Sequence, residues 1–134
     1  MSLRWYTLVI DCHDVHAQAR WWARTIGGSI VYEAEDEAVV LPPGADPEPI
    51  ADLQTWLRTG TGLVFVPVPE GKTVKNRLHI DLAPHSSQDR HAEIAELIER
   101  GATRVDVGQS DQDTWEVLAD PEGNEFCVLS SRQR

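Results

Sequence analysis

RWYTLVIDCHDVHAQARWWARTIGGSIV (residues 4–31) reads as a β-strand, an amphipathic helix and a second strand. The later stretch NRLHIDLAPHSSQDRHAEIAELIERGATRV (76–105) repeats that order, and each helical run ends at glycine. Two further strand-like segments follow each copy. The duplication predicts an α+β fold made of two tandem βαβββ modules.

Capping residues indicate where the two helices begin and end. In the first copy Asp14 is expected to cap the helix, and the glycines at 27–28 to end it. Its core-facing stripe is Val15, Ala19, Trp22 and Ile26. In the second copy a serine at 86–87 opens the helix and Gly101 closes it. The second stripe is Ile94, Leu97 and Ile98.

The remaining strands are predicted from alternation at 29–35, 37–41 and 62–68 in the first copy, and at 102–107, 114–120 and 124–130 in the second. The segment 42–60 is an insertion with a short helix inside 46–57, and the loop 69–75 joins the copies. We therefore expect one domain over residues 1–134, with module one at about 1–70 and module two at about 74–134.

Composition excludes several classes of partner. The chain has 12 basic and 22 acidic residues and a net charge of −10, which argues against a nucleic-acid partner. No apolar run approaches a membrane span, and MSLRWYTLVID lacks a signal-peptide pattern, so we expect a soluble, cytoplasmic protein without a membrane partner. Cys12 and Cys127 are too few for a disulfide framework, and both are expected to be reduced inside β-strands.

The segment KNRLHIDL (75–82) raises the functional question. As a strand it places Leu78, Ile80 and Leu82 on one face, and Arg77, His79 and Asp81 on the other. That second face is a solvated surface, a metal site or the floor of a pocket.

Three stretches carry a family resemblance: IDCHD with ARWWARTIGG, PEGKTVKNRLHIDL at the junction, and WEVLADPEGNEFCVL. Over essentially the whole chain, the sequence resembles the vicinal oxygen chelate superfamily, which includes glyoxalase I, extradiol dioxygenases and bleomycin-resistance proteins. More narrowly, it resembles the glyoxalase-like domain branch. The resemblance implies that the modules form an open, cup-like mixed sheet with helices on the convex side and ligands in the concavity.

The resemblance also implies a metal ligand on the first and last strand of each module. Those positions here read Thr7, Val66, His79 and Cys127. Valine cannot ligate and neutral threonine is a poor ligand, so we expect no metal ion and no cofactor in the protein as purified. An offset site of nitrogen and oxygen ligands remains an alternative, made of Asp11, His79, Asp81 and Glu125.

Strand parity supports the pocket interpretation. The alternate positions are apolar and expected to meet the helices: Leu8, Ile10, Leu78, Ile80, Phe126 and Val128. The charged faces then meet the cup. We assign His79, Asp81 and Glu125 as catalytic, because a histidine between carboxylates is suited to acid/base work. The substrate-binding candidates are Arg77, Trp115, Asp11 and Cys127. The alternative is structural: Asp11 caps a turn, Asp81 pairs with Arg77 or Lys75, and Glu125 is solvated.

The expected function is that of a glyoxalase-like protein binding a small metabolite, with lyase or isomerase chemistry that uses His79 as acid/base. The alternative is a metal-free protein that sequesters a small molecule, as bleomycin-resistance proteins do. We also expect a homodimer. In this superfamily a partner chain often completes a single cup, and the neighbouring Trp21 and Trp22 suggest that one ring is left for a subunit contact.

Overall fold

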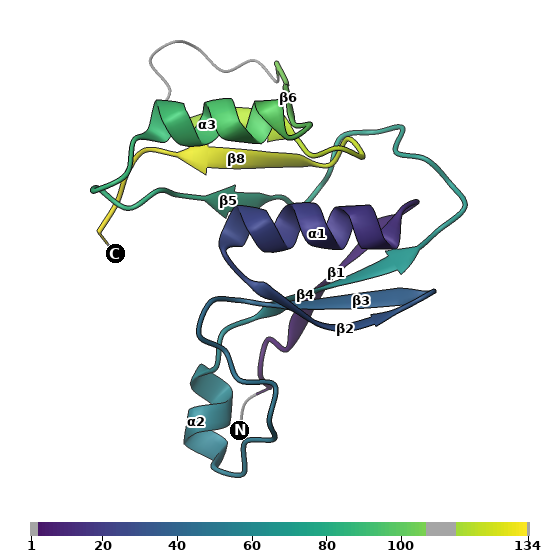
Figure 1. The fold of residues 1–134 in the computed structure, drawn as a ribbon, viewed down its shortest axis with the longest axis vertical. Helices are drawn as coiled ribbons and strands as arrows, with labels where there is room; N and C mark the ends of the chain where they lie inside the picture. The colour runs from purple at the N-terminus through teal and green to yellow at the C-terminus, as the bar shows by residue number, and fades with distance from the viewer. Residues whose placement is uncertain (1–2, 107–114, 134) are drawn as a thin grey trace. The chain divides into compact units, whose positions relative to one another are not determined.

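The structure, a computed structural model, describes residues 3–106 and 115–133. It divides into two compact units, unit 1 (Met1–Gly71) and unit 2 (Lys72–Arg134). Each unit has a four-stranded mixed sheet with a helix on it, and neither sheet closes into a barrel within the described residues (Figure 1). The predicted α+β class and the tandem modules are confirmed.

Unit 1 follows the predicted order of elements. They are β1 (Thr7–Cys12), α1 (Val15–Ile26), β2 (Ser29–Ala34), β3 (Glu37–Leu41) and β4 (Gly62–Pro67). The strand order in the sheet is β1-β4-β3-β2. The first and last strands, β1 and β4, run parallel, and the other pairs are antiparallel. The crossover through α1 therefore joins the two edge strands of the sheet, β1 and β2.

The ends of α1 follow from local chemistry, as predicted. The Asp14 carboxylate accepts a hydrogen bond from the Ala17 N–H at 3.0 Å, which satisfies a backbone donor of the first turn. At the other end Gly27 has φ 67°, a left-handed conformation that favours glycine. Of the predicted stripe, Val15, Ala19 and Trp22 are buried and Ile26 is half-buried.

The expectation that Trp21 or Trp22 serves a subunit contact is wrong. Both rings are buried, with exposed fractions of 7% and 2%, and they pack edge to face with centroids 5.2 Å apart. Neighbouring helix residues lie about 100° apart, and α1 buries an arc wide enough to include both. The homodimer remains a prediction without this support.

The insertion contains the predicted short helix, α2, but only over Leu53–Arg58. The Asp52 carboxylate caps it, accepting from the Thr55 N–H at 2.8 Å and the Thr55 hydroxyl at 2.7 Å. The helix is shorter than the predicted segment because its capping residue lies well inside that segment.

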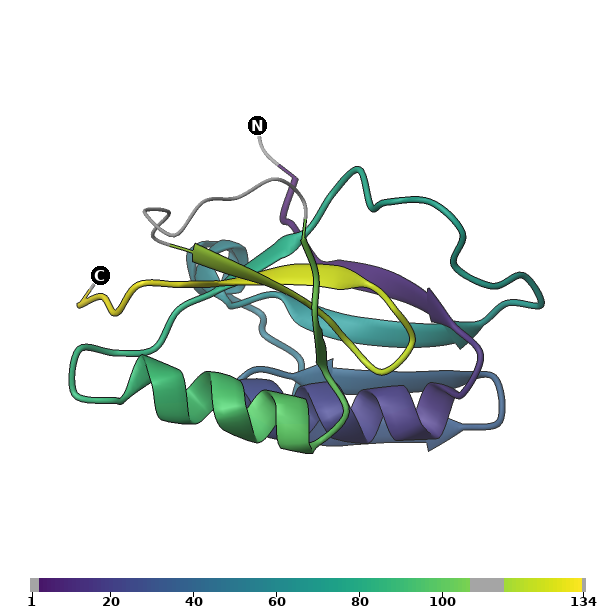
Figure 2. The same cartoon turned by 90° about the horizontal axis from the view of Figure 1, so that it is seen from above.

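Unit 2 repeats the architecture with shorter strands. Its elements are β5 (Ile80–Leu82), α3 (Arg90–Glu99), β6 (Thr103–Arg104), β7 (Trp115–Ala119) and β8 (Glu125–Leu129). The strand order is β5-β8-β7-β6, with β5 and β8 parallel. Both views show α3 on one side of β8 (Figures 1 and 2). The Arg90 guanidinium donates to the carbonyls of Val128 and Leu129 at 3.0 Å, which ties the start of α3 to β8.

The predicted start of α3 at Ser86 or Ser87 is wrong. Asp89 caps the helix instead, accepting from the N–H groups of His91 and Ala92. The Ser87 hydroxyl is already used in a turn, where it hydrogen-bonds to His85 Nδ1 at 2.7 Å. Three residues able to cap a helix, Ser86, Ser87 and Asp89, lie close together, and the turn occupies the Ser87 hydroxyl.

The predicted strand over 75–82 is also too long, because only Ile80–Leu82 pairs with β8. Leu78, expected in the core, is 85% exposed. The backbone N–H of Asn76 bonds to the Glu125 carboxylate rather than to a strand carbonyl, so Asn76 is not yet part of the sheet. By contrast, Phe126 and Val128 are buried on the core-facing parity, as predicted.

Two other predicted strands reach beyond the described residues. Of the segment 102–107, only Thr103–Arg104 forms the strand β6, although the Val105 N–H also donates to the Val117 carbonyl, and Val107 lies outside the described part of the chain. Thr114, the predicted start of the next strand, also lies outside it. In the described ranges no helix combines the length and apolar content needed to cross a bilayer.

Candidate functional site

A cavity of about 330 Å³ opens on unit 2, on the sheet face that carries the odd-numbered residues of β7 and β8. Its lining residues are Lys75, His79, Asp81, Trp115, Val117, Glu125, Phe126, Cys127 and Leu129. Most of the wall is apolar, and the ionisable side chains gather where β5 meets β8. Cavities of this size, apolar with a few convergent polar groups, are typical small-molecule sites.

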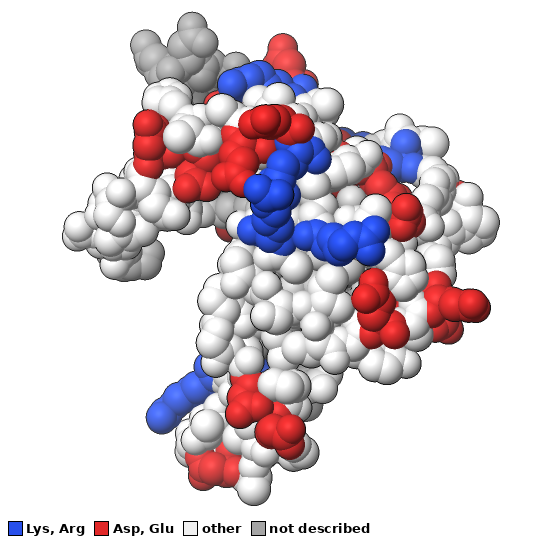
Figure 3. Space-filling view, in the orientation of Figure 1, with Lys and Arg blue, Asp and Glu red and all other residues white. Residues whose placement is uncertain are grey.

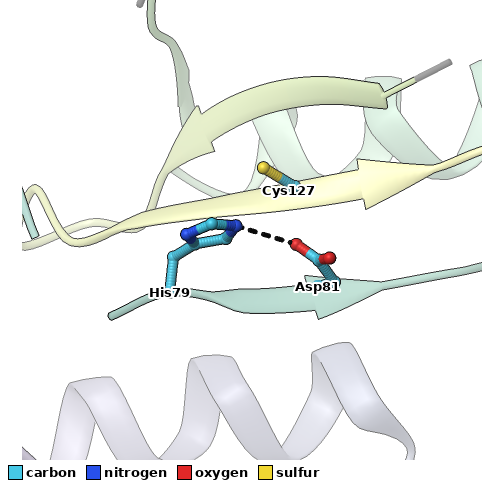
Figure 4. A group of neighbouring side chains, drawn as sticks. All are labelled: His79, Asp81 and Cys127. Atoms are coloured by element: carbon cyan, nitrogen blue, oxygen red, sulfur yellow. Dashed lines mark ion pairs between the residues drawn. The ribbon is translucent and has the colours of Figure 1, made fainter. Parts of the chain in front are cut away.

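The register of β5 against β8 brings three of these side chains together. Asp81 pairs directly with Cys127, and His79 lies two positions before Asp81, so all three side chains are on one face. Their ligand-type atoms all lie within 4.8 Å of one another. Figure 4 shows His79 and Asp81 turned toward each other, with Cys127 on the neighbouring strand. We call His79, Asp81 and Cys127 the β5–β8 cluster.

Within this cluster His79 Nε2 lies 3.1 Å from Asp81 Oδ1. The two side chains are 45% and 48% exposed, so solvent screens their attraction and it adds little to stability. The main effect of the contact with Asp81 is to orient the His79 ring. A carboxylate on one ring nitrogen favours a proton there and leaves the other nitrogen, Nδ1, with its lone pair.

Cys127 is buried, and its surroundings keep the thiol protonated near neutral pH. Burial is the largest cause that raises its pKa, followed by the negative charge of Asp81 and a hydrogen bond to that carboxylate. The Lys75 ammonium group opposes these effects but does not overcome them. The Asp81 carboxylate is therefore the acceptor for both neighbours in the cluster.

Glu125 lines the same cavity, but its carboxylate is committed to the loop before β5. It accepts hydrogen bonds from the Lys72 ammonium group and the Asn76 N–H, each at 3.0 Å. Burial alone raises the pKa of Glu125, but the bonds from Asn76 and Lys72 outweigh it, so the net pKa is below its ordinary value. The group stays ionised near neutral pH and fixes the loop to β8.

The remaining predicted binding residues have different outcomes. Trp115 lines the cavity and is 40% exposed, so its ring offers flat apolar contact. Arg77 is exposed and is not among the described residues that line the cavity. Asp11 belongs to unit 1, where it is exposed on β1 opposite Val66. The site role of each of these residues remains a prediction.

The contact between Asp81 and Cys127 was missed in the sequence, although a signal for it exists. Both units pair an isoleucine of the first strand with a phenylalanine of the last: Ile10 with Phe65, and Ile80 with Phe126. If the two units are aligned on these isoleucines and phenylalanines, Cys127 falls opposite Asp81. The internal repeat, used as a guide to register, therefore carries the information.

A second cavity, of about 250 Å³, lies on unit 1 and was not predicted. Arg4 lines it, with its guanidinium carbon 5.1 Å from the centre of the Tyr6 ring and 5.0 Å from that of Trp56. The buried Arg4 Nε has no hydrogen-bond partner within the described residues. No sequence pattern links the N-terminal segment with the inserted helix, so this arrangement could not be predicted from the sequence.

The charge distribution agrees with the acidic composition. Figure 3 shows acidic side chains scattered over the visible face and basic ones confined to a few small groups. The absence of a nucleic-acid partner remains a prediction that rests on composition.

Several solved structures share the fold of this chain. A glyoxalase/bleomycin resistance protein/dioxygenase family enzyme from Burkholderia phytofirmans is 14% identical, with a TM-score of 0.67 over 97% of this chain and all of that one. A glyoxalase/bleomycin resistance protein from Albidiferax ferrireducens is 16% identical, with a TM-score of 0.59 over 96% and 98%. These likenesses show that the chain has the same fold as those proteins.

A third neighbour was solved with a metal and a small ligand. It is the fosfomycin resistance protein FosX from Listeria monocytogenes, complexed with Mn(II) and dihydroxypropylphosphonic acid. It is 9% identical, with a TM-score of 0.68 over 98% of this chain and 93% of that one. No curated protein matches the sequence. The model of the glyoxalase-like domain family matches residues 7–129, and the chain belongs to that family.

The four metal positions implied by the superfamily do not fit a metal here. The Thr7 hydroxyl donates to the Gly62 carbonyl at 3.1 Å, and Val66 has no donor atom. Strand register also corrects the sequence alignment, because Val9 rather than Thr7 is equivalent to His79 when Ile10 is matched to Ile80. On either alignment unit 1 offers no first-strand ligand, so the four-position set is incomplete.

Proposed function

We propose that this glyoxalase-like protein binds a small carbonyl or hydroxylated metabolite in the unit 2 cavity and moves a proton on it with His79. The observation that carries the proposal is the His79–Asp81 contact of 3.1 Å at the wall of a ligand-sized cavity. Acid/base chemistry of the isomerase or lyase type requires a base oriented in this way.

The walls of the cavity support binding of a flat or partly apolar molecule. Trp115, Val117 and Leu129 supply apolar surface, and the Lys75 ammonium group is the cation of the lining. A cation beside the base would stabilise negative charge that develops on a carbonyl oxygen as a neighbouring carbon loses its proton. The apolar wall and the Lys75 cation therefore both suit a partly apolar substrate that carries a carbonyl group.

Each polar residue then has a distinct role in the proposed reaction. His79 takes the proton on Nδ1 and returns it, while Asp81 holds the ring through Nε2. Glu125 stays ionised and holds the loop that carries Lys75 and His79 through its bonds to Lys72 and Asn76. The Cys127 thiol donates to Asp81 and completes the support of that carboxylate.

The test is exchange of carbon-bound protons in deuterated water, followed by NMR, with a panel of small 2-hydroxy and 2-oxo compounds. The wild-type protein should catalyse exchange on at least one member, and His79→Gln should lower that rate by about a hundred- to ten-thousand-fold. The exposed His91 on α3 provides the control, and His91→Gln should leave the rate unchanged. Exchange that survives in folded His79→Gln would remove His79 from this role.

A metal-free binding protein is the second candidate, favoured by the missing ligands at Thr7 and Val66. It makes a different prediction for the same panel. Ligands should then raise the melting temperature of wild-type and His79→Gln protein alike, with no exchange in either. A shift that is abolished by Trp115→Ala would locate binding in the unit 2 cavity.

A further inference from the structure

We propose that the unit 1 cavity of about 250 Å³ is a second ligand site, and that it binds a basic amino acid such as lysine. Arg4 holds the carboxylate of the ligand, and Asp46 and Glu37 hold its two ammonium groups. None of these three residues lines the unit 2 cavity. The proposal is therefore independent of the function proposed above.

The insertion in unit 1 forms one wall of this cavity. Between β3 and β4 the chain runs through residues 42–61, whereas the equivalent strands of unit 2, β7 and β8, are joined by 120–124 alone. The insertion residues that line the cavity are Ala45, Asp46, Pro47, Ile50, Thr59 and Gly60. The site therefore depends on a part of unit 1 that is not repeated in unit 2.

The floor of the cavity is the open face of β3 and β4, and it is apolar in the middle. Val39 pairs with Val64 there, and both line the cavity. Leu41 and Glu37 lie two residues to either side of Val39 on the same face of β3, and both also line the cavity. Leu41 is next to the insertion, so the Glu37 carboxylate marks the far end, about 13 Å along the strand.

Arg4 lies at the insertion end of the cavity, with hydrogen-bonding capacity to spare. Its guanidinium carbon is 5.1 Å from the centre of the Tyr6 ring and 5.0 Å from that of Trp56, and these cation–π contacts fix its position. Within the described residues its one hydrogen bond runs from Nη2 to the Gly60 carbonyl, at 3.5 Å, and the buried Nε has no partner.

A guanidinium with unused N–H groups is suited to a carboxylate, which it can bind through two parallel hydrogen bonds. Tyr6 is 66% exposed, so its ring can rotate and admit an acceptor to the buried Nε of Arg4. Binding of a carboxylate would then satisfy a charged donor that is costly to leave unpaired.

The two acidic residues of the lining determine what else the ligand carries. Asp46 follows the turn in which the Ala45 N–H donates to the Pro42 carbonyl, directly after β3, so it lies at the same end as Arg4. One oxygen of Asp46 accepts from the Glu48 N–H at 2.9 Å, which leaves the other for a ligand. Glu37 supplies the second carboxylate, at the far end of the floor.

One cation and two carboxylates are matched by a ligand with one carboxylate and two ammonium groups. A phosphate or a dicarboxylate would be repelled by Asp46 and Glu37, and a diamine would leave Arg4 unpaired. In a basic amino acid the α-carboxylate and α-ammonium groups reach Arg4 and Asp46 together. The methylene chain then lies over the valines of the floor, and the terminal ammonium group points to Glu37.

The experiment is calorimetry with L-lysine and two analogues that each lack one charged group. L-Norleucine has no side-chain ammonium group, and 1,5-diaminopentane has no carboxylate. Lysine should bind wild-type protein at one molecule per chain, and each analogue should bind at least about tenfold more weakly.

Substitutions in the site should change this preference in specific ways. Arg4→Gln should reduce lysine affinity to that of 1,5-diaminopentane. Glu37→Gln should reduce it to that of norleucine and leave norleucine binding unchanged. Asp46→Asn should weaken binding of both amino acids. The controls are the exposed Arg58→Gln on α2 and Glu35→Gln beside β3, which should leave lysine binding unchanged.

Three results would overturn the proposal. The first is the absence of saturable lysine binding to folded wild-type protein at millimolar concentration. The second is wild-type affinity in folded Arg4→Gln, and binding that is lost in Trp115→Ala instead would place lysine in the unit 2 cavity. If Arg4→Gln fails to fold, Glu37→Gln decides, because an unchanged preference for lysine over norleucine in that variant is the third result.

Discussion

Unit 1 and unit 2 pair their first and last strands in the same register, yet they differ in what they present on the open face of the sheet. Ile10 and Phe65 in unit 1 correspond to Ile80 and Phe126 in unit 2. Both phenylalanines are almost fully buried, at 0% and 1% exposure. At the intervening positions, valines in unit 1 stand where unit 2 has His79 and Cys127.

The difference shows how one strand pair meets two separate requirements. Every second residue must be apolar to meet the helix, and those residues are similar in both units. The residues between them are not required to be apolar by this contact, so these positions can carry ionisable side chains in one unit and valines in the other. Four experiments, from the largest expected effect to the smallest, test or sharpen this comparison.

Truncating the equivalent phenylalanines should have the largest effect. Phe65→Ala and Phe126→Ala each leave a cavity in a buried layer and should lower the free energy of unfolding by about 3–5 kcal/mol. Urea denaturation measures both, with the exposed Val9→Ala as the control. A loss below 1 kcal/mol for one phenylalanine, with the full loss for the other, would break the structural equivalence of the units.

The Glu125 anchor belongs to unit 2, because its counterpart at the same register in unit 1 is Val64. Glu125→Gln removes the partner of Lys72 and weakens the bond from Asn76, so we expect a loss of about 1–3 kcal/mol in unfolding free energy at pH 7.

The pH dependence of that loss has a definite sign. The folded pKa of Glu125 is below its ordinary value of 4.5, so its contribution is present above pH 4.5 and is lost as the pH falls through the folded value. The difference between wild type and Glu125→Gln should therefore shrink in acid. A difference that stays constant down to about pH 2 would contradict the assignment.

The helix-to-strand connection gives the third comparison. Gly28 and Ala102 both donate their N–H to the carbonyl five residues earlier, so they are equivalent. A Cβ on Gly28 would lie 2.3 Å from the Leu41 carbonyl oxygen, which is backbone and cannot move aside. Gly28→Ala should lose about 1–3 kcal/mol, and Ala102→Gly about 0.5–1 kcal/mol. Thermal unfolding of both variants measures the difference, and a stabilised Gly28→Ala would refute the clash.

The helix caps should show the smallest effect and the closest agreement between the units. Asp14→Ala and Asp89→Ala each remove the acceptor for backbone N–H groups and should cost about 1 kcal/mol. The serines at 86–87 provide the control, since Ser86→Ala should cost less than Asp89→Ala by chemical denaturation. The reverse order would restore the serine as the cap.

Features set by neighbouring residues were predictable where one capping residue stood alone, but not at the start of α3, and features set by distant residues were not predictable. The ends of α1 follow from Asp14 and Gly27, which act on their own turns. The late start of β5 depends on Asn76 and Glu125, 49 positions apart. Parity along a strand placed His79 and Asp81 on one face, but the approach of Cys127 depends on the register between two strands.

Each unit shelters one thiol, Cys12 in unit 1 and Cys127 in unit 2, at 2% and 7% exposure. A thiol reagent reaches such a sulfur atom only when the structure around it opens. The two labelling rates, separated by peptide mass spectrometry, therefore report the opening free energies of the two units independently in a single unmodified chain. A ligand of one unit would slow labelling of its own cysteine, and the other cysteine would serve as the internal reference.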